Sequence, residues 1–475
     1  MLQMKYYIEP MAHQKKSLEK SRILRNMYLA WDMGTGKTAA TVNIVRRYLP
    51  PKVLVLCPKP VVEGWKKEFW DHGRLPVTVL RGKMKEKVAQ LANANGIVVT
   101  NLEFLSRSVE GYEAMRKFSP HVLVIDEAHR CKSPSSQLGK RVATIARNTE
   151  RNILLSGTPI LNGLEDIFQQ YKILEANEDK RTFGDNLGKF RERYMFDANA
   201  PKRARMVQAM GRYFPDWQPR LGAPQEVSKL IKYNTLLVKQ SECLDLPPVL
   251  RKKMYCELEG DQKRAYKQMR QEFITFIEGA TKLDNTRVAL ATQATTKAIR
   301  LQQIVNGFVK DELGQNIALK SNPKLKVLEE LLLEHIKFGK VVVWACFKHN
   351  YNDIRNLCLK HKIKYAEYHG EIKHKELQKR KFIEDKSVKV MIANQQSAGT
   401  GLDGLQIAPT CIYFSRNFSL EHDSQSEKRT MRKGSEVHNK LLRIDIVMRS
   451  SIDEQVLEAL EKKQNIQDVI LSWKL

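Results

Sequence analysis

Residues 34–38 combine glycine, lysine and threonine in a pattern that can bind phosphate. The segment Gly34-Thr35-Gly36-Lys37-Thr38 follows a short apolar run and precedes a helical stretch at residues 39–48. Glycines let backbone N–H groups turn inward around phosphate oxygens, while Lys37 supplies a charge for the β- and γ-phosphates and Thr38 a hydroxyl for Mg²⁺. The generic pattern has another glycine at position 31, where this chain has Trp31. Taken alone, these five residues also fit a plain turn at the start of a helix.

Two adjacent carboxylates, Asp126 and Glu127, follow the apolar run at residues 122–125. An aspartate at the carboxyl end of a parallel strand can hold Mg²⁺, and the neighbouring glutamate can polarise an attacking water. Alone, such acidic residues are commonly helix caps. Together with a phosphate loop on a separate strand they predict a nucleotide hydrolysis site, with Lys37, Asp126 and Glu127 as catalytic residues and with Thr38 and Asp126 as magnesium ligands.

Two further polar segments are candidates for coupling and for charge stabilisation. Ser156-Gly157-Thr158-Pro159 follows the apolar run at 153–155, and its hydroxyls can sense the γ-phosphate, although the pattern alone favours an ordinary turn. Gln425, Arg429 and Arg432 are spaced by four and three residues, so a helix would place them on one face. An arginine there can stabilise the transition state of phosphoryl transfer, but spacing alone favours a solvated basic helix.

The sequence around these residues predicts an α/β architecture, in which strands and helices alternate. Short apolar runs at 28–30, 53–56, 97–99, 122–125 and 153–155 are followed by longer amphipathic segments, which predicts buried parallel strands separated by helices. The alternation returns after Pro323, with strands predicted at 341–344, 388–392, 410–414 and 441–447. Because 475 residues exceed one ordinary core, we expect two parallel-sheet lobes, at residues 1–245 and 246–475.

The middle of the chain breaks this alternation. Residues from about 175 to 240 are rich in Arg, Lys, Phe and Tyr and contain four prolines, which predicts a mostly helical insertion in the first lobe. Leu246-Pro247-Pro248 predicts a stiff connector. Residues from about 255 to 315 predict a helical protrusion at the start of the second lobe. The expected fold is therefore α/β, with helical protrusions inserted between and around the two sheets.

The amino-acid composition indicates which kinds of partner and which location to expect. The chain has 81 Lys+Arg against 53 Asp+Glu, a net charge of +28 that favours nucleic acid over a protein that is basic only for solubility. No run approaches the roughly 20 apolar residues that span a membrane, and the N-terminus has no signal-peptide core, so no membrane partner is expected. The seven cysteines form no CxxC pair, which argues against a zinc site or a disulfide framework and favours an intracellular location.

These segments, in this order, resemble the Swi/Snf-type DNA translocases of helicase superfamily two, over nearly the whole chain. Residues 29–38 resemble the first motif of that family, which does not require a glycine at position 31, and residues 10–14 resemble its adenine-reading element. The other segments that follow the family's form are residues 55–59 with 65–69, 126–133, 155–162, 244–248, Gln262, Tyr266, 301–307, His369-Gly370, 398–405 and 425–434.

The resemblance implies two RecA-like lobes, ATP as substrate, Mg²⁺ and a set of site residues. Those implied to bind ATP are His13, Gln14, Gly34, Thr35, Gly36, Lys37 and Thr38. Those implied to couple hydrolysis to motion are His129, Ser156, Thr158, Gly401 and Asp403, with Lys132 as a secondary member, while Gln425, Arg429 and Arg432 complete the catalytic set. Those implied to contact the DNA backbone are Lys59, Thr100 and Ser397. The sequence departs from the family's pattern at Trp31-Asp32, at Asp403 in place of Asn and at Ser435 in place of Gln.

The function implied is an ATP-driven motor that translocates on double-stranded DNA and remodels DNA or protein–DNA complexes. It would hold duplex or branched DNA mainly by the phosphate backbone. The alternatives are a strand-separating or branch-migrating and annealing helicase, a DNA-binding scaffold with a degenerate ATPase, and an RNA helicase, which fits the protrusions poorly. No chromatin-reader or long acidic segment accompanies the motor segments, which favours the cytoplasm of a bacterium or of a phage-infected host cell. A protein partner is left open.

Overall fold

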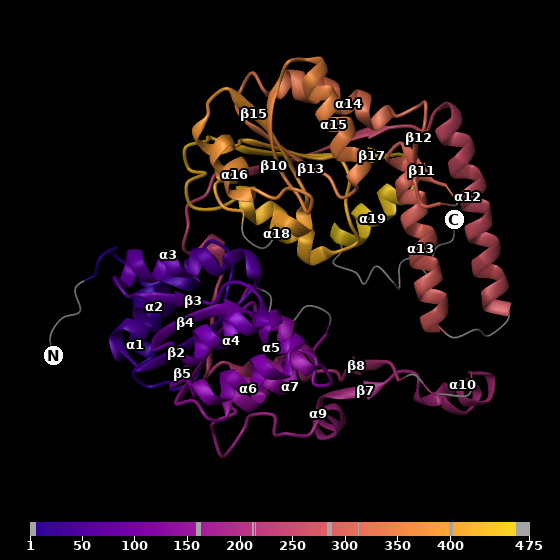
Figure 1. Cartoon of the computed structure of the whole chain (residues 1–475). Helices are drawn as coiled ribbons and strands as arrows, with labels where there is room; N and C mark the ends of the chain where they lie inside the picture. Colours follow the sequence, from indigo (N-terminus) through magenta and orange to yellow (C-terminus); the bar gives the residue numbers. More distant parts are fainter. Residues whose placement is uncertain are drawn as a thin grey trace. The chain divides into compact units, whose positions relative to one another are not determined.

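Strands from the first half of the chain form one parallel sheet, and strands from the second half form another (Figure 1). The structure is a computed structural model that describes residues 6–157, 163–210, 213, 215–282, 287–311, 313–398 and 402–461. It divides into two units. Unit 1 comprises Met1–Pro201 and Pro215–Leu244, and unit 2 comprises Lys202–Phe214 and Asp245–Leu475.

The sheet of unit 1 has the strand order β3-β4-β2-β5-β6-β1-β9, and all its pairings are parallel. Its strands are β1 (Met27–Trp31), β2 (Lys52–Cys57), β3 (Val77–Val79), β4 (Gly96–Asn101), β5 (Val122–Asp126), β6 (Arg151–Ser156) and β9 (Thr235–Val238). Alternate residues face opposite sides: Leu54 and Leu56 of β2 join one core cluster, and Val53 and Val55 join another. Because both faces of the sheet are buried, the sequences of the central strands are continuous apolar runs.

Helices connect these strands, as parallel pairing requires. They are α1 (Ala12–Lys20), α2 (Lys37–Tyr48), α3 (Val62–Gly73), α4 (Met84–Ala92), α5 (Leu102–Arg107), α6 (Val109–Phe118), α7 (Gln137–Ala146) and α8 (Asp166–Leu174), with the short 3₁₀ turns η1 (Lys59–Val61) and η2 (Ala128–Cys131). Two of the helix starts are fixed by serine caps: Ser108 accepts from the backbone N–H of Gly111, and Ser136 from that of Gly139.

The stretch from about 175 to 240 contains strands as well as helices. Its helices are α9 (Leu187–Tyr194), α10 (Arg203–Met210) and α11 (Ala223–Ile231), followed by the turn η4 (Gln240–Glu242). Strands β7 (Met195–Asp197) and β8 (Trp217–Pro219) pair as an antiparallel hairpin. Strand β9 pairs with β1 at the edge of the sheet, which the sequence did not indicate.

The sheet of unit 2 has the order β10-β17-β16-β13-β15-β14 and is also parallel. Its strands are β10 (Val249–Cys256), β13 (Val341–Trp344), β14 (Lys364–Tyr368), β15 (Val388–Ala393), β16 (Thr410–Tyr413) and β17 (Leu441–Met448). Its helices and turns are α12 (Gly260–Lys282), α13 (Arg287–Val305), α14 (Pro323–His335), α15 (Lys348–Lys360), α16 (Lys375–Glu384), α17 (Gln395–Ala398), η5 (Leu405–Ile407), α18 (Leu420–Thr430) and α19 (Ile452–Glu461). A hairpin of β11 (Phe308–Lys310) and β12 (Asn316–Ala318) follows α13.

The predicted fold class is confirmed, because each unit is built on a parallel sheet with connecting helices. Helices α12 and α13 pack against each other as a long pair (Figure 1), in the stretch where a helical protrusion is predicted. Among the helices in the described part of the chain, none combines the length and apolar character needed to cross a membrane.

Candidate active site

The phosphate loop lies between the end of β1 at Trp31 and the start of α2 at Lys37. Its two glycines, Gly34 and Gly36, have φ angles of 80° and 77°, a region that glycine adopts without steric cost. Thr35 is buried and its hydroxyl donates to the carbonyl of Asp32 at 2.7 Å, which closes the turn. The N-terminus of α2 therefore opens directly onto the loop, and a helix N-terminus favours an anion.

His13 and Gln14, from the first turn of α1, hold this loop by its backbone. His13 Nε2 donates to the Thr35 carbonyl at 2.8 Å, and Gln14 Nε2 donates to the Gly36 carbonyl at 3.1 Å. A Cβ atom at Gly36 would lie 2.2 Å from Gln14 Nε2, so a side chain there would displace the glutamine. The adenine-reading candidates are thus engaged with the phosphate loop in this structure.

The Lys37 ammonium folds back onto the same loop. Lys37 Nζ donates to the carbonyl of Trp31 at 2.7 Å and to that of Asp32 at 3.2 Å. Gly157, just after β6, is close by, because a Cβ atom there would lie 3.9 Å from Lys37 Nζ. A phosphate that enters the loop must therefore compete with two carbonyl oxygens for the lysine.

The Asp126 carboxylate lies at the carboxyl end of β5 with both oxygens hydrogen-bonded. Trp65 Nε1 donates to Oδ2 at 2.9 Å, and the backbone N–H of Glu127 donates to Oδ1 at 3.0 Å. Burial, and after it the Glu127 charge, raises the pKa of Asp126 from 3.8 to about 6, while Trp65 and the Lys37 charge oppose the rise. The Lys37 effect indicates that the lysine and the aspartate share one site.

Glu127, His129 and Ser156 form a contact chain from β5 to β6. Glu127 has a φ of 53°, an uncommon backbone conformation that begins the η2 turn. His129 is buried, and its Nδ1 lies 3.3 Å from Glu127 Oε2 and 3.1 Å from Ser156 Oγ. Lys132 pairs with Asp166 at 3.1 Å. The other predicted member of this group, Thr158, lies outside the described residues.

The groups at this site suit magnesium held partly by a substrate. Within the described residues there is no cluster of three or more His, Cys, Asp or Glu side chains that could bind a metal by itself. The half-buried Asp126 carboxylate, together with the Thr38 hydroxyl at the start of α2, offers the oxygen ligands that Mg²⁺ prefers, and phosphates commonly complete its coordination. Asp126 and Thr38 therefore have the chemistry that a Mg²⁺ site requires.

A cavity of about 930 Å³ lies beside this loop within unit 1. Its lining includes His13 and Trp31, whose rings meet edge to face with centroids 4.9 Å apart. Backbone and side chains of β9 and α11 form the other wall, with Lys229 and Lys232 among them. The volume is in the range of small-molecule sites.

In unit 2, the predicted arginines are paired with Asp403. Arg429 Nη1 donates to Asp403 Oδ1 at 2.9 Å, and Arg432 pairs with the same oxygen. Gln425 and Arg429 are buried on α18, whereas Asp403 exposes 59% of its side chain. The predicted coupling residue Gly401 lies outside the described residues.

The three predicted DNA contacts differ in accessibility. Lys59 is exposed in the η1 turn after β2, and Ser397 is half-buried on α17, where its backbone N–H donates to Asn394 Oδ1 at 3.1 Å. Thr100 is fully buried near the end of β4, so in this conformation its hydroxyl is not available to a surface ligand. The family resemblance implies all three as contacts to the DNA backbone, and that role stays a prediction.

Sequence reasoning also missed side chains that support the site. Trp65 is one of them, although its segment was recognised as part of a family motif. Another is Lys87 on α4, which donates to Asn101 at 2.9 Å; Asn101 donates to Glu103, and Glu103 accepts from Arg130 of the η2 turn. Burial, and then the Lys59 charge, lowers the pKa of Lys87, so the two lysines lie near each other. No local sequence pattern signals these contacts, because their partners come from separate elements.

Comparisons with known proteins agree with this architecture. A family profile described as the SNF2-related domain matches residues 13–308, and the helicase conserved C-terminal domain matches residues 323–434. The chain is 26% identical over 460 residues to putative protein p41 of Acyrthosiphon pisum secondary endosymbiont phage 1, which covers 92% of this chain and 93% of that protein. It is 25% identical over 466 residues to the probable ATP-dependent DNA helicase CHR12 of Arabidopsis thaliana, covering 93% of this chain and 40% of the relative.

A yeast protein and a solved structure are also similar to the chain. The ISWI chromatin-remodeling complex ATPase ISW1 of Saccharomyces cerevisiae is 23% identical over 492 residues, covering 96% of this chain and 39% of the relative. The chain therefore spans about two fifths of the length of the plant and yeast proteins. The Sulfolobus solfataricus SWI2/SNF2 ATPase core in complex with dsDNA is 21% identical, with a TM-score of 0.43 and coverage of 99% of this chain and 95% of that one. By the extent of the profile match, the chain belongs to the SNF2-related family of superfamily-two, helicase-like ATPases.

Proposed function

We propose that this protein is a DNA-stimulated ATPase that translocates on double-stranded DNA and thereby remodels DNA or protein–DNA complexes. The observation that carries the proposal is the meeting of the phosphate loop and the Asp126–Glu127 pair at the carboxyl ends of β1 and β5, with the Lys37 charge acting on Asp126. Membership of the SNF2-related family supports it. The net charge of +28 supports a polyanionic track.

Each group has a distinct task in this proposal. The loop amides and the N-terminus of α2 bind the phosphates of ATP, and Lys37 leaves the carbonyls of Trp31 and Asp32 to neutralise them. Magnesium, when bound between Asp126, Thr38 and the phosphates, would neutralise charge on the β- and γ-phosphates. Glu127 orients the attacking water, and the His129–Ser156 contact holds Glu127 in register with β6. The base and sugar would occupy the cavity beside His13 and Trp31.

The arginines of unit 2 would act when the two units close on ATP. Arg429 and Arg432 would then exchange Asp403 for the γ-phosphate and stabilise the charge that develops in the transition state. Closing and reopening would move one unit along the duplex, so hydrolysis is gated by domain motion. Lys59 and Ser397 would grip the backbone of duplex or branched DNA. The phage relative and the free cysteines support a site of action inside a bacterium or a phage-infected host cell.

The decisive test is hydrolysis by the Lys37→Ala variant. We expect DNA-stimulated phosphate release to be abolished, because the charge that neutralises the phosphates is lost, while affinity for duplex DNA stays within about two-fold of wild type. The matched control is Lys140→Ala, since Lys140 is an exposed lysine on α7 of the same unit. Hydrolysis retained by Lys37→Ala would refute the site. Absence of DNA-stimulated hydrolysis in the wild type would instead indicate a scaffold.

A second assay separates translocation from strand separation. We expect the wild type with ATP to displace a third strand from a triplex, since tracking along a duplex removes it without opening base pairs. A forked duplex should remain paired under the same conditions. Displacement of the forked strand without triplex displacement would assign a strand-separating helicase instead.

A further inference from the structure

The indole of Trp65 donates a hydrogen bond to the Asp126 carboxylate, the group assigned to magnesium. Trp65 Nε1 lies 2.9 Å from Asp126 Oδ2, across 61 residues of sequence, and joins α3 to the end of β5. The other oxygen, Oδ1, accepts from the Glu127 backbone at 3.0 Å. With one donor on each oxygen, the carboxylate cannot rotate without breaking a bond. Its remaining lone pairs have a fixed direction.

A structural explanation alone does not account for this contact. A buried indole usually finds a partner, and Trp65 exposes only 2% of its surface. Yet among the residues that the structure describes, the fully buried indole of Trp31 has no hydrogen-bond partner in the protein. The fold therefore does not require a partner for every buried indole. The partner of Trp65 is the carboxylate that the proposed mechanism assigns to magnesium.

The position of Trp65 in α3 connects that carboxylate to the surface. Helix α3 begins at Val62, directly after the η1 turn Lys59–Val61, so Trp65 lies one helical turn from it. Lys59 in that turn is exposed and is the proposed contact for the DNA backbone. The Trp65 ring packs on Phe69 of the same helix, with centroids 5.8 Å apart, and both side chains belong to the core under β2 and β5. A displacement of the turn is therefore passed to the indole by a packed, rigid element.

We propose that Trp65 is a positioning residue that orients the Asp126 carboxylate and makes its orientation depend on what the Lys59–Val61 turn contacts. Hydrogen bonds weaken steeply with small changes of angle and distance, so a small movement of α3 is enough to alter the carboxylate. This role rests on the proposed function, because it assumes that DNA binds at the turn. It gives DNA a direct structural route to the hydrolysis site within unit 1.

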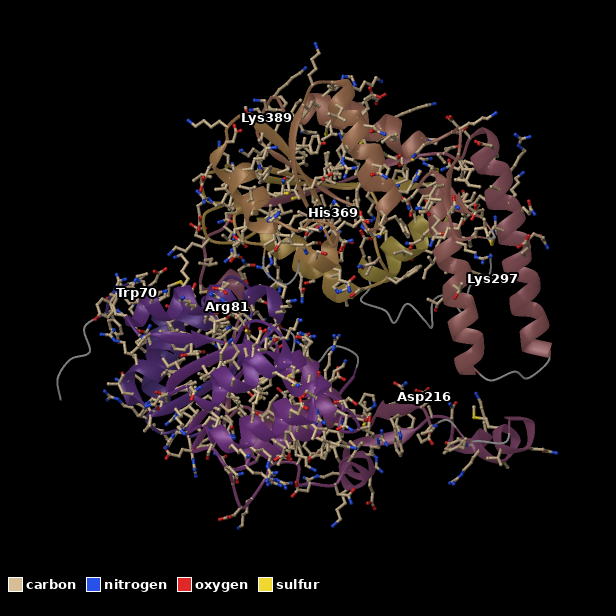
Figure 2. The ribbon with its side chains drawn as sticks, viewed as in Figure 1. Trp70, Arg81, Asp216, Lys297, His369 and Lys389 are labelled. Carbon is tan, nitrogen blue, oxygen red and sulfur yellow. The ribbon has the colours of Figure 1, made fainter. Side chains whose placement is uncertain are left out.

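The first test compares Trp65→Phe with Trp70→Phe. Phenylalanine fills most of the space of the indole but has no N–H donor. Trp70 lies on the same helix with 54% of its surface exposed, which makes it a matched control (Figure 2). Loss of a residue that orients a metal ligand typically costs about 10- to 100-fold in metal affinity or activity. For Trp65→Phe we expect the Mg²⁺ concentration for half-maximal ATPase to rise about ten-fold and stimulation by duplex DNA to fall about ten-fold. DNA affinity should stay within about two-fold, and Trp70→Phe should match the wild type.

The second test measures the environment of the Trp65 ring by ¹⁹F NMR, in the absence of ATP hydrolysis. In protein labelled with 5-fluorotryptophan, the ¹⁹F resonance missing from Trp65→Phe belongs to Trp65; if that variant does not fold, the resonance most displaced by Asp126→Asn identifies it. We expect this resonance to shift on addition of duplex DNA without nucleotide, and the shift to be lost in Lys59→Ala. A resonance that is insensitive to DNA, or a Trp65→Phe enzyme with unchanged Mg²⁺ dependence and DNA stimulation, would overturn the inference. Neither result would affect the Lys37→Ala test of the proposed function.

Discussion

At the scale of single residues, the proposed role of Asp126 as a magnesium ligand predicts that magnesium binding depends on pH. Its pKa is raised to about 6, first by burial and then by the Glu127 charge. Because Mg²⁺ binds the ionised carboxylate, we expect affinity for MgATP to fall as the pH drops through about 6. Glu127→Gln removes one cause of the raised pKa, so its midpoint should lie at lower pH. Titration of a fluorescent ATP analogue measures both midpoints, and an unchanged or higher midpoint in Glu127→Gln would contradict the assignment.

The same group affects stability with a definite sign. The folded protein binds the Asp126 proton more tightly than the unfolded chain, because the pKa is raised from 3.8 to about 6. The free energy of unfolding from this group therefore declines as the pH rises between these two values. Bound magnesium favours the ionised form and should offset the decline. Thermal unfolding with and without Mg²⁺ at the two ends of this window measures the effect.

A second residue-scale prediction concerns Asp403, which pairs with both Arg429 and Arg432. In the proposed mechanism these ion pairs would compete with ATP for the arginines, but Asp403 is 59% exposed, so the strength of the pairs is modest. Exposed pairs are typically worth about 0.2–1 kcal/mol, which corresponds to a factor of up to about five. We expect Asp403→Asn to lower the KM for ATP by about two- to five-fold with little change in kcat. A loss of kcat greater than about ten-fold would show instead that the charge of Asp403 is needed to orient the arginines.

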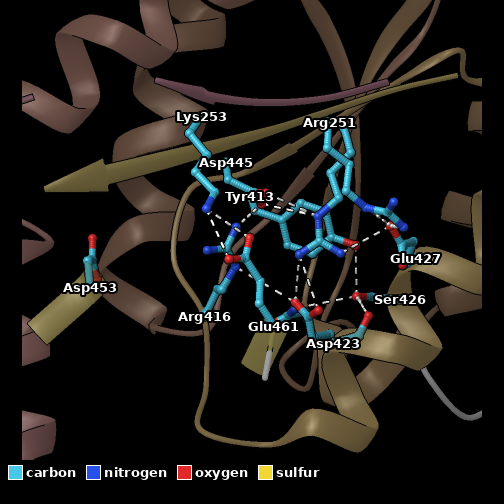
Figure 3. Close-up of polar contacts among 12 residues, drawn as sticks. Arg251, Lys253, Tyr413, Arg416, Asp423, Ser426, Glu427, Asp445, Asp453 and Glu461 are labelled. Carbon is cyan, nitrogen blue, oxygen red and sulfur yellow. Dashed lines mark hydrogen bonds and ion pairs between the residues drawn. The ribbon is translucent and has the colours of Figure 1, made fainter. Parts of the chain in front are cut away.

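At the scale of elements, a buried ionic cluster anchors α18 to its sheet (Figure 3). Arg443 of β17 pairs with Asp423 of α18 at 3.1 Å and with Asp445 at 3.2 Å, and its guanidinium lies 4.1 Å from the centroid of the Tyr413 ring. Arg416 also pairs with Asp445. All four charged side chains are at most 12% exposed. The cluster therefore fixes the helix that carries Gln425 and Arg429.

Removing one charge from this cluster should lower the free energy of unfolding considerably. Asp423→Asn leaves Arg443 incompletely compensated in the interior, and breaking a buried ion pair typically destabilises by about 3–5 kcal/mol. We expect amide hydrogen exchange in α18 to accelerate correspondingly and ATPase turnover to fall. The control is Glu384→Gln, which removes the exposed pair with Arg380 and should cost less than about 1 kcal/mol. Equal protection of α18 in both variants would show that the cluster does not hold the helix.

Within the two parallel sheets, the strands that the sequence failed to predict share one property. The central strands β1, β2, β5, β6, β13, β15, β16 and β17, and also β4, lie at predicted apolar runs, whereas the four missed strands β3, β9, β10 and β14 are the edges of the two sheets. An edge strand has one unpaired side and need not be apolar on both faces. Strand β10, with Arg251, Lys252 and Lys253 exposed, shows no apolar run. Its place in a sheet follows only from pairing with β17.

As with the strands, the site residues that lie in a local sequence pattern could be proposed from the sequence, and those defined by packing could not. Lys37, Asp126 and Glu127 could be proposed from the sequence because each lies in a local pattern of fixed spacing. Contacts such as Trp65 with Asp126, or Asp403 with Arg429, join separate elements, so they depend on packing that no local pattern encodes. The burial of Thr100 follows likewise from its place in a strand with both faces covered.

At the scale of the whole molecule, the net charge of +28 makes a prediction about how DNA is held. If Lys and Arg side chains bind phosphates rather than base edges, two duplexes of equal length and unlike sequence should bind with affinities within about three-fold of each other. Each released counterion adds to the salt dependence, so log K should fall linearly with log salt, with a slope of about −0.9 per phosphate contact. Fluorescence anisotropy between about 50 and 200 mM NaCl measures both quantities. Lys59→Ala should make the slope shallower by about one for both duplexes alike, because it removes one phosphate contact. A slope near zero, or a difference of more than about ten-fold between the duplexes, would indicate base readout, which is incompatible with a motor that must hold every sequence along its track.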